Sequence, residues 1–174
     1  MKDITAFKNV TAGLYKDATC SELICDWDSL QRRKVIRVIN DVLCGTTTID
    51  QVDSLAGVLV IPECVKKICD NAFTRESNLV GVLTLGKLQS IGKAAFMGCS
   101  NLQTIQVNCE DIGESAFMRC MNLKEVCNQA DHSVVGQNAF CWCLSLRDVV
   151  LPKDTKVYDK AFFGCDKDIE IEYV

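Results

Sequence analysis

The stretch Ile91-Gly92-Lys93-Ala94-Ala95-Phe96-Met97-Gly98-Cys99-Ser100-Asn101-Leu102 recurs, with variations, through the C-terminal two-thirds of this 174-residue chain. Its most constant part is the dipeptide Ala-Phe, which occurs at residues 72–73, 95–96, 116–117, 139–140 and 161–162. A fixed period of about 20 to 50 residues is typical of a solenoid, in which each repeat buries its apolar face against its neighbours. The spacing therefore predicts a solenoid over residues 54–174, made of one half-repeat and five repeats.

Three further positions of the repeat are nearly constant. A branched apolar residue stands four positions before each Ala, a cysteine usually follows three after each Phe, and a leucine usually follows six after it. The three sets are Ile68, Ile91, Ile112, Val135 and Val157; Glu76, Cys99, Cys120, Cys143 and Cys165; and Leu79, Leu102, Leu123, Leu146 and Asp168.

Alternating apolar and polar residues after each leucine predict a short strand with one buried face. We expect these strands to stack in parallel. The remaining dozen or so residues of each repeat would return the chain through one turn of α- or 3₁₀-helix. In the first full repeat, which has one extra residue, we expect Leu83 and Leu85 to fill the buried strand positions.

The unit Ile-Gly-x-x-Ala-Phe-x-x-Cys-x-x-Leu-x-x-Ile-x-Val resembles the BspA-like class of leucine-rich repeats over about residues 54–174. The resemblance implies an α/β leucine-rich-repeat solenoid that recognises proteins, often as an adhesin at the cell surface. Pro62 and Pro152 also stand where that family often has proline, just after the strand. Glu76 and Asp168 depart from the pattern.

The first residues, Met1-Lys2-Asp3-Ile4-Thr5, lack the basic start and apolar core of a secretory signal. If this N-terminus is native, we expect a cytoplasmic protein. The resemblance favours the alternative, a location on the cell surface.

Residues 1–53 do not show the repeat and predict a helical N-terminal cap. A helix over Ser29–Cys44 would place Val35, Ile36, Ile39, Val42 and Leu43 on one side, and a shorter helix is expected over Ala18–Trp27. Such a cap would cover the apolar end of the first rung. The alternative is a small docking module that offers its helix face to a partner.

The composition excludes several classes of protein. With 19 basic and 23 acidic residues and no long Lys/Arg cluster, the sequence indicates no nucleic-acid partner. No run approaches the roughly 18 apolar residues of a membrane span. Twelve cysteines are present, and four of them, Cys99, Cys120, Cys143 and Cys165, share one repeat position. Stacked rungs would hold their Cβ vectors parallel, which does not suit a disulfide, so we expect buried free thiols.

No catalytic constellation is evident, which predicts a non-enzymatic protein without cofactor or metal. The single histidine, His132, lies in a loop outside the repeat, and no glycine-rich phosphate loop is present. One alternative is a zinc site from His132, Cys141 and Cys143, although structural zinc usually takes four regularly spaced ligands. A broader alternative is a redox or metal-binding protein that uses the cysteines outside the shared position: Cys20, Cys25, Cys44, Cys64, Cys69, Cys109, Cys127 and Cys141.

The strand face is the first candidate binding surface. Equivalent positions of successive repeats form columns, and two of these are charged: Gln103, Lys124 and Arg147, beside Thr104, Glu125, Asp148 and Glu170. A third column is Val60, Thr84, Gln106, Cys127, Val150 and Glu172. This face would suit a polar or charged segment of a protein partner. The alternative is that the two charged columns only satisfy each other across the strands.

The return layer is the second candidate. The residue after each Phe is apolar in four repeats, namely Met97, Met118, Cys141 and Phe163, and Trp142 stands beside this column. Exposed apolar side chains and tryptophans are favoured at interfaces, so an apolar ridge is predicted unless these residues pack inward on the flank.

Finally, the edge of the strand at 168–174 is a candidate for self-association, which Glu170 and Glu172 would discourage.

Overall fold

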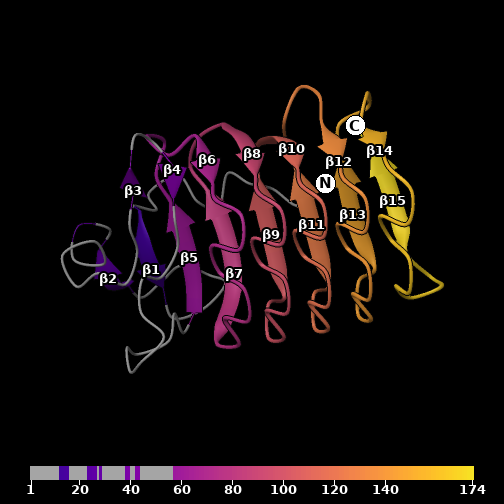
Figure 1. Ribbon diagram of the computed structural model, residues 1–174, viewed down its shortest axis with the longest axis horizontal. Coiled ribbons are helices and arrows are strands. Elements are labelled where there is room, and N and C mark those ends of the chain that lie inside the picture. The colour runs from indigo at the N-terminus through magenta and orange to yellow at the C-terminus, as the bar shows by residue number, and fades with distance from the viewer. Residues whose placement is uncertain (1–11, 16–22, 27, 29–37, 40–41, 44–56) are drawn as a thin grey trace.

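The computed structural model describes residues 12–15, 23–26, 28, 38–39, 42–43 and 57–174. From residue 57 onward each repeat adds one strand to each of two sheets, and the rungs follow one another along the long axis of the molecule (Figure 1). Strands from successive repeats lie side by side and are parallel. The C-terminal two-thirds is therefore a parallel β-solenoid, which confirms the predicted solenoid.

The larger sheet has eight strands in the order β15-β13-β11-β9-β7-β5-β1-β2, and the smaller has seven in the order β14-β12-β10-β8-β6-β4-β3. The strands of the larger sheet are β1 (Gly13–Tyr15), β2 (Leu23–Asp26), β5 (Gly57–Ile61), β7 (Leu79–Thr84), β9 (Thr104–Val107), β11 (Glu125–Asn128), β13 (Asp148–Leu151) and β15 (Glu170–Tyr173). Those of the smaller sheet are β3 (Val38–Ile39), β4 (Val42–Leu43), β6 (Lys67–Ile68), β8 (Leu88–Ile91), β10 (Cys109–Ile112), β12 (Val134–Val135) and β14 (Lys156–Val157).

The larger sheet shows the predicted alternation of buried and exposed residues. In β9, Ile105 and Val107 are buried, whereas Thr104 and Gln106 are half-buried on the other face. The expected register of β7 is wrong, because Val82 pairs with Ile105 and Leu83 pairs with Gln106. The additional residues of that repeat lie instead in the turn 85–87, between β7 and β8.

The predicted helical or 3₁₀ return segments are wrong. Residues 57–174 contain no helix, and the return path consists of a strand of the smaller sheet followed by a run of turns around Ala-Phe. In these turns the N–H groups alternate between two kinds of acceptor. The N–H of Ala95 donates to the carbonyl oxygen of Gly92, three residues back, whereas that of Phe96 donates to the carbonyl oxygen of Ala116 in the next rung.

The backbone conformation explains why a helix cannot form there. Two positions in every rung have positive φ, as at Ala94 (53°) and Gly98 (76°). An α-helix needs consecutive residues with negative φ, whereas a type II turn needs a positive φ at its third residue. The equivalent left-handed residues in the other rungs are Asn71, Ser115, Asn138 and Lys160, and Arg75, Arg119, Trp142 and Gly164. The fold over 57–174 is therefore all-β rather than α/β.

Columns of identical side chains fill the space between the two sheets. Five phenylalanines stack with near-parallel rings, at centroid distances of 5.0, 5.2, 5.3 and 5.3 Å along the series Phe73, Phe96, Phe117, Phe140 and Phe162. Cys99, Cys120 and Cys143 are buried and free, as predicted, whereas Cys165 is free but only half-buried. Because each rung repeats the same side chains at the same depth, the core is continuous along the solenoid.

The predicted helices of the N-terminal cap are wrong wherever the structure describes them. Leu23–Asp26 is strand β2, and Val38–Ile39 and Val42–Leu43 are strands β3 and β4. Strand β1 lies antiparallel to both β2 and β5, and β4 runs parallel to β6, so these strands extend both sheets. Val38, Ile39 and Val42 are β-branched and favour strands over helices. The other residues of both predicted helices, and the boundary at 53/54, lie outside the described residues.

Candidate binding interface

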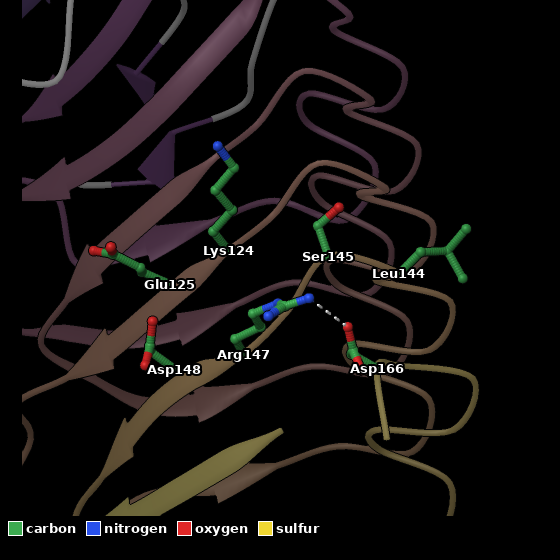
Figure 2. A pocket seen from close by; sticks show the side chains of 7 residues that line it. All are labelled: Lys124, Glu125, Leu144, Ser145, Arg147, Asp148 and Asp166. Atoms are coloured by element: carbon green, nitrogen blue, oxygen red, sulfur yellow. Dashed lines mark hydrogen bonds and ion pairs between the residues drawn. The ribbon is translucent and has the colours of Figure 1, made fainter. Parts of the chain in front are cut away.

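A hollow of about 360 Å³ lies where β11 and β13 begin, and it brings together four of the predicted site residues (Figure 2). Glu125 and Asp148 are the first residues of β11 and β13, and Lys124 and Arg147 directly precede them. Glu125 is directly opposite Asp148 in the parallel ladder, so the two charged columns run side by side through the hollow. The residues that line it are Lys124, Glu125, Leu144, Ser145, Arg147, Asp148 and Asp166.

The charges of the hollow are mixed. The Nη2 atom of Arg147 lies 3.2 Å from Oδ2 of Asp166, and this pair joins β13 to the turn of the next rung. Asp166 is the more covered partner, because its side chain is 24% exposed against 65% for Arg147. Lys124 is exposed and forms no ion pair within the part of the chain that the structure describes. A ligand could therefore reach a free ammonium group beside two outward-facing carboxylates.

The sequence missed three residues of the hollow. Leu144, Ser145 and Asp166 belong to the turns between the cysteine and leucine positions, outside the strand columns. A signal for Leu144 exists in the sequence. The residue after the cysteine position is serine in the first two repeats (Ser77 and Ser100) but apolar in the next two (Met121 and Leu144), and Leu144 is 48% exposed.

The other members of the predicted columns lie outside the hollow. Thr104 is paired with Glu125 and continues that column by one rung, and Gln103 precedes it. In the third column, Leu83 takes the place that was expected for Thr84. Leu83 is buried together with Val58 and Val60 in a small apolar cluster. The outer face of the larger sheet is thus apolar at β5 and β7 and charged at β11, β13 and β15.

The predicted apolar ridge is exposed only at its C-terminal end. Met97 and Met118 are half-buried and Cys141 is buried, whereas Trp142 is 44% and Phe163 55% exposed. The rings of Trp142 and Phe163 meet edge to face at a centroid distance of 5.8 Å. The side chains of Met97 and Met118 therefore contribute less accessible surface than the sequence suggested.

The buried thiols of the repeat are poor nucleophiles. Burial raises the pKa of Cys99 and of Cys165 to about 12, which keeps both protonated near neutral pH. His132 is exposed in its loop. Across the described residues, no group of three or more His, Cys, Asp or Glu side chains is arranged to hold a metal ion. The same residues include no helix long and apolar enough to span a membrane.

The model of the BspA type leucine rich repeat region matches residues 54–168 in six copies. The chain belongs to this family. No curated protein matches it. The crystal structure of the T. pallidum leucine-rich repeat protein TpLRR matches with a TM-score of 0.65 and 25% identity, over 78% of this chain and 66% of that one.

A second similar structure is a leucine-rich cell surface protein from Faecalibacterium prausnitzii A2-165. It has a TM-score of 0.53 and 26% identity, over 67% of this chain and 35% of that one. This BspA-type chain therefore spans less than two-thirds of the length of each of these two relatives.

Proposed function

We propose that this leucine-rich-repeat chain is a non-enzymatic binding module that holds a charged segment of a protein partner on the outer face of its larger sheet. The observation that carries the proposal is the meeting of both charged columns in one hollow, where the ammonium group of Lys124 forms no ion pair with any residue that the structure describes. The backbones of β11 and β13 are fixed by ladders to β9 and β15, so the side chains are presented from a rigid support. Solenoids of this kind use such repeated surfaces for recognition.

The mixed charge of the hollow indicates the kind of segment. An acidic side chain of the partner would face Lys124, and a basic one would face Glu125 and Asp148. The exposed side chain of Leu144 offers an apolar contact at the rim. Such complementary charges set the register and specificity of binding more than its strength.

Crosslinking in the cells that make the protein tests the proposal. A photoreactive amino acid placed at Ser145 should give an adduct with one defined protein, and the same group at Ser90 on the smaller sheet should not. Purified partner should then lose affinity for the double variant Lys124→Glu/Arg147→Glu. The matched control is Lys67→Glu/Lys153→Glu, which makes the same change of charge at exposed lysines elsewhere. Equal binding of the partner by both double variants would show that the hollow is not the binding site.

A second candidate function is that of an adhesin-like surface protein. It is favoured by the similarity to the leucine-rich cell surface protein of F. prausnitzii. Labelling of intact cells with an impermeant biotin reagent decides between this location and the cytoplasm. Labelled protein from unbroken cells supports the surface, and label only after lysis supports the cytoplasm.

A further inference from the structure

We propose that the exposed end of the turn layer is a second docking site, for a partner segment that combines acidic and apolar side chains. The site, here called the aromatic ridge, consists of Arg119, Trp142, Lys160 and Phe163. It uses none of the residues that line the hollow, and it takes acidic and apolar side chains alone, whereas the hollow faces partner charges of both signs.

Backbone hydrogen bonds hold the aromatic ridge together. The N–H of Trp142 donates to the carbonyl oxygen of Phe163 in the next rung, and that of Phe163 donates to the carbonyl oxygen of Lys160, at 2.8 and 3.1 Å. Arg119 occupies the position of Trp142 one rung earlier, and its N–H donates to the carbonyl oxygen of Cys141 at 2.8 Å. The indole of Trp142 also packs on Gly164, where a Cβ atom would come within 3.0 Å of it.

Trp142 is strained as well as exposed. Its φ is 63°, in a repeat position that Gly98 and Gly164 fill in other rungs. A residue with a side chain costs about 1–2 kcal/mol in this left-handed conformation. A bulky aromatic residue that is 44% exposed thus stands where the backbone favours glycine. Strain held at an exposed tryptophan points to a role in binding, since such residues dominate the energetics of interfaces.

The charge around the aromatic pair selects the partner. Arg119 and Lys160 are exposed, and neither forms an ion pair with another described residue. The N–H of Arg119 donates to the carbonyl oxygen of Cys141, and the carbonyl oxygen of Lys160 accepts from the N–H of Phe163, so both residues belong to the same stacked turns as the two rings. Two cations beside two exposed rings are complementary to carboxylates next to apolar side chains.

An anionic membrane surface has related chemistry, but the charge of the whole chain disfavours it. An anionic bilayer interacts electrostatically with an extended face of a protein, and it repels a chain whose formal net charge is −4. A short peptide segment contacts only the nearby charges of Arg119 and Lys160. The observations therefore favour a protein segment over a lipid surface.

The test uses two synthetic peptides of about 12 residues, one in which Asp and Glu alternate with Leu and Phe, and one with Lys in place of each acidic residue. In the variant Trp27→Phe, Trp142 is the single tryptophan, so its fluorescence reports binding. We expect a saturable change with the acidic peptide at about 10–100 μM and none with the basic one. Calorimetry on the chain without the Trp27→Phe substitution measures the same affinity independently of tryptophan fluorescence.

Two variants test whether the acidic peptide binds at the aromatic ridge. Trp142→Gly removes the indole at a position that favours glycine, so the fold is retained, and affinity should fall at least about tenfold. Arg119→Glu/Lys160→Glu should abolish binding of the acidic peptide, whereas Lys124→Glu/Arg147→Glu in the hollow should leave it unchanged. The proposal is overturned if the acidic peptide does not bind, if it binds Trp142→Gly equally, if the hollow variant loses it, or if phosphatidylserine vesicles bind in its place.

Discussion

The thiol of Cys120 donates a hydrogen bond to the carbonyl oxygen of Phe96 in the preceding rung, across 3.2 Å. The same relationship links Cys99 to Phe73, Cys143 to Phe117 and Cys165 to Phe140, at 3.1 to 3.2 Å. Each of these carbonyl groups also accepts a bond from the backbone N–H three residues further on. The cysteine column therefore supplies a second, weak donor to the carbonyl groups of four stacked phenylalanines, Phe73, Phe96, Phe117 and Phe140, besides filling space as a small apolar residue.

This relationship predicts an order of stability among substitutions at Cys120. Cys120→Ala removes the donor and leaves a small void, so we expect a loss of about 1–2 kcal/mol. Cys120→Ser keeps a donor in nearly the same place and should cost less than alanine. Urea unfolding followed by circular dichroism measures both. If serine proved the more damaging substitution, the thiol would act only as an apolar filler.

Buried thiols also predict that the protein becomes less stable in alkaline solution. Burial raises the pKa of Cys99 and of Cys109 from the ordinary 9.0 to about 12. Below 9.0 both folded and unfolded chains keep these protons. Above it the unfolded chain releases them while the folded chain retains them, so the free energy of unfolding falls as the pH rises toward 12.

Urea midpoints from about pH 7 to about pH 10.5 measure this dependence. Lysine and tyrosine side chains titrate in the same range, so the control is Cys99→Ala, which should lose stability less steeply with pH than the natural chain. Identical slopes for the two proteins would mean that the thiol of Cys99 does not contribute.

The phenylalanine stack should carry far more stability than the aromatic side chains at the surface. Phe117 stacks between Phe96 and Phe140, with centroids at 5.2 and 5.3 Å, and is fully buried. Phe117→Ala should therefore cost about 3–5 kcal/mol. Phe163→Ala, at a ring that is 55% exposed, should change stability by no more than about 0.5 kcal/mol. Comparable losses for the two variants, measured by thermal or urea unfolding, would contradict the division between core and ridge.

A buried asparagine tests how far the repeat pattern determines stability. Asn128 takes a strand position that Val107 and Leu151 fill in neighbouring rungs. Its Nδ2 donates to the carbonyl oxygen of Cys109 at 2.8 Å and to Oγ of Ser133 at 2.8 Å, while its Oδ1 accepts from the N–H of Cys109 at 2.9 Å.

The substitution Asn128→Leu matches the pattern but leaves both backbone groups of Cys109 without these partners. We expect a loss of about 2–4 kcal/mol, because buried polar groups that lose their hydrogen bonds cost about 1–3 kcal/mol each. The exposed Asn122 provides the control, since Asn122→Leu should change stability by less than about 0.5 kcal/mol. A stabilised Asn128→Leu protein would show that the apolar consensus outweighs the hydrogen bonds.

Periodicity predicted the features that depend on which residues recur. The columns of Phe, Cys and Leu, the strands of the larger sheet and the adjacency of Lys124 to Arg147 all follow from equal spacing in a stacked ladder. The strands of the smaller sheet were missed because several, such as β6 and β12, are only two residues long. At that length a strand has no alternation to detect.

Features that depend on backbone conformation could not be predicted. Ala94 and Arg119 carry no sequence signal for a positive φ, because alanine and arginine rarely adopt it. Without that information a dozen residues between strands suggest a helical turn. Similarly, Ile39, Val42 and Leu43 fit a helical period as well as they fit β3 and β4. The contribution of Asp166 to the hollow depends on where a turn places it, which spacing alone does not determine.

The positive φ values lead to a last prediction, a substitution to glycine that stabilises the protein. Arg119 has a φ of 63° and an exposed side chain, and the equivalent residue is glycine in two other rungs. A residue with a side chain loses about 1–2 kcal/mol of folding free energy in the left-handed conformation. Glycine avoids that loss, but it costs about 0.5–1 kcal/mol because the unfolded chain gains conformational entropy. Arg119→Gly should therefore raise the free energy of unfolding by about 0.5–1 kcal/mol.

The matched control is Gln137→Gly, at an exposed position of the same turn layer that is not among the residues with positive φ. There glycine brings only its entropic cost, so stability should fall by about 0.5–1 kcal/mol. Urea unfolding of the two variants under identical conditions gives changes of opposite sign if the left-handed conformation is strained. Destabilisation by both substitutions would show that the stacked turns hold Arg119 without measurable strain.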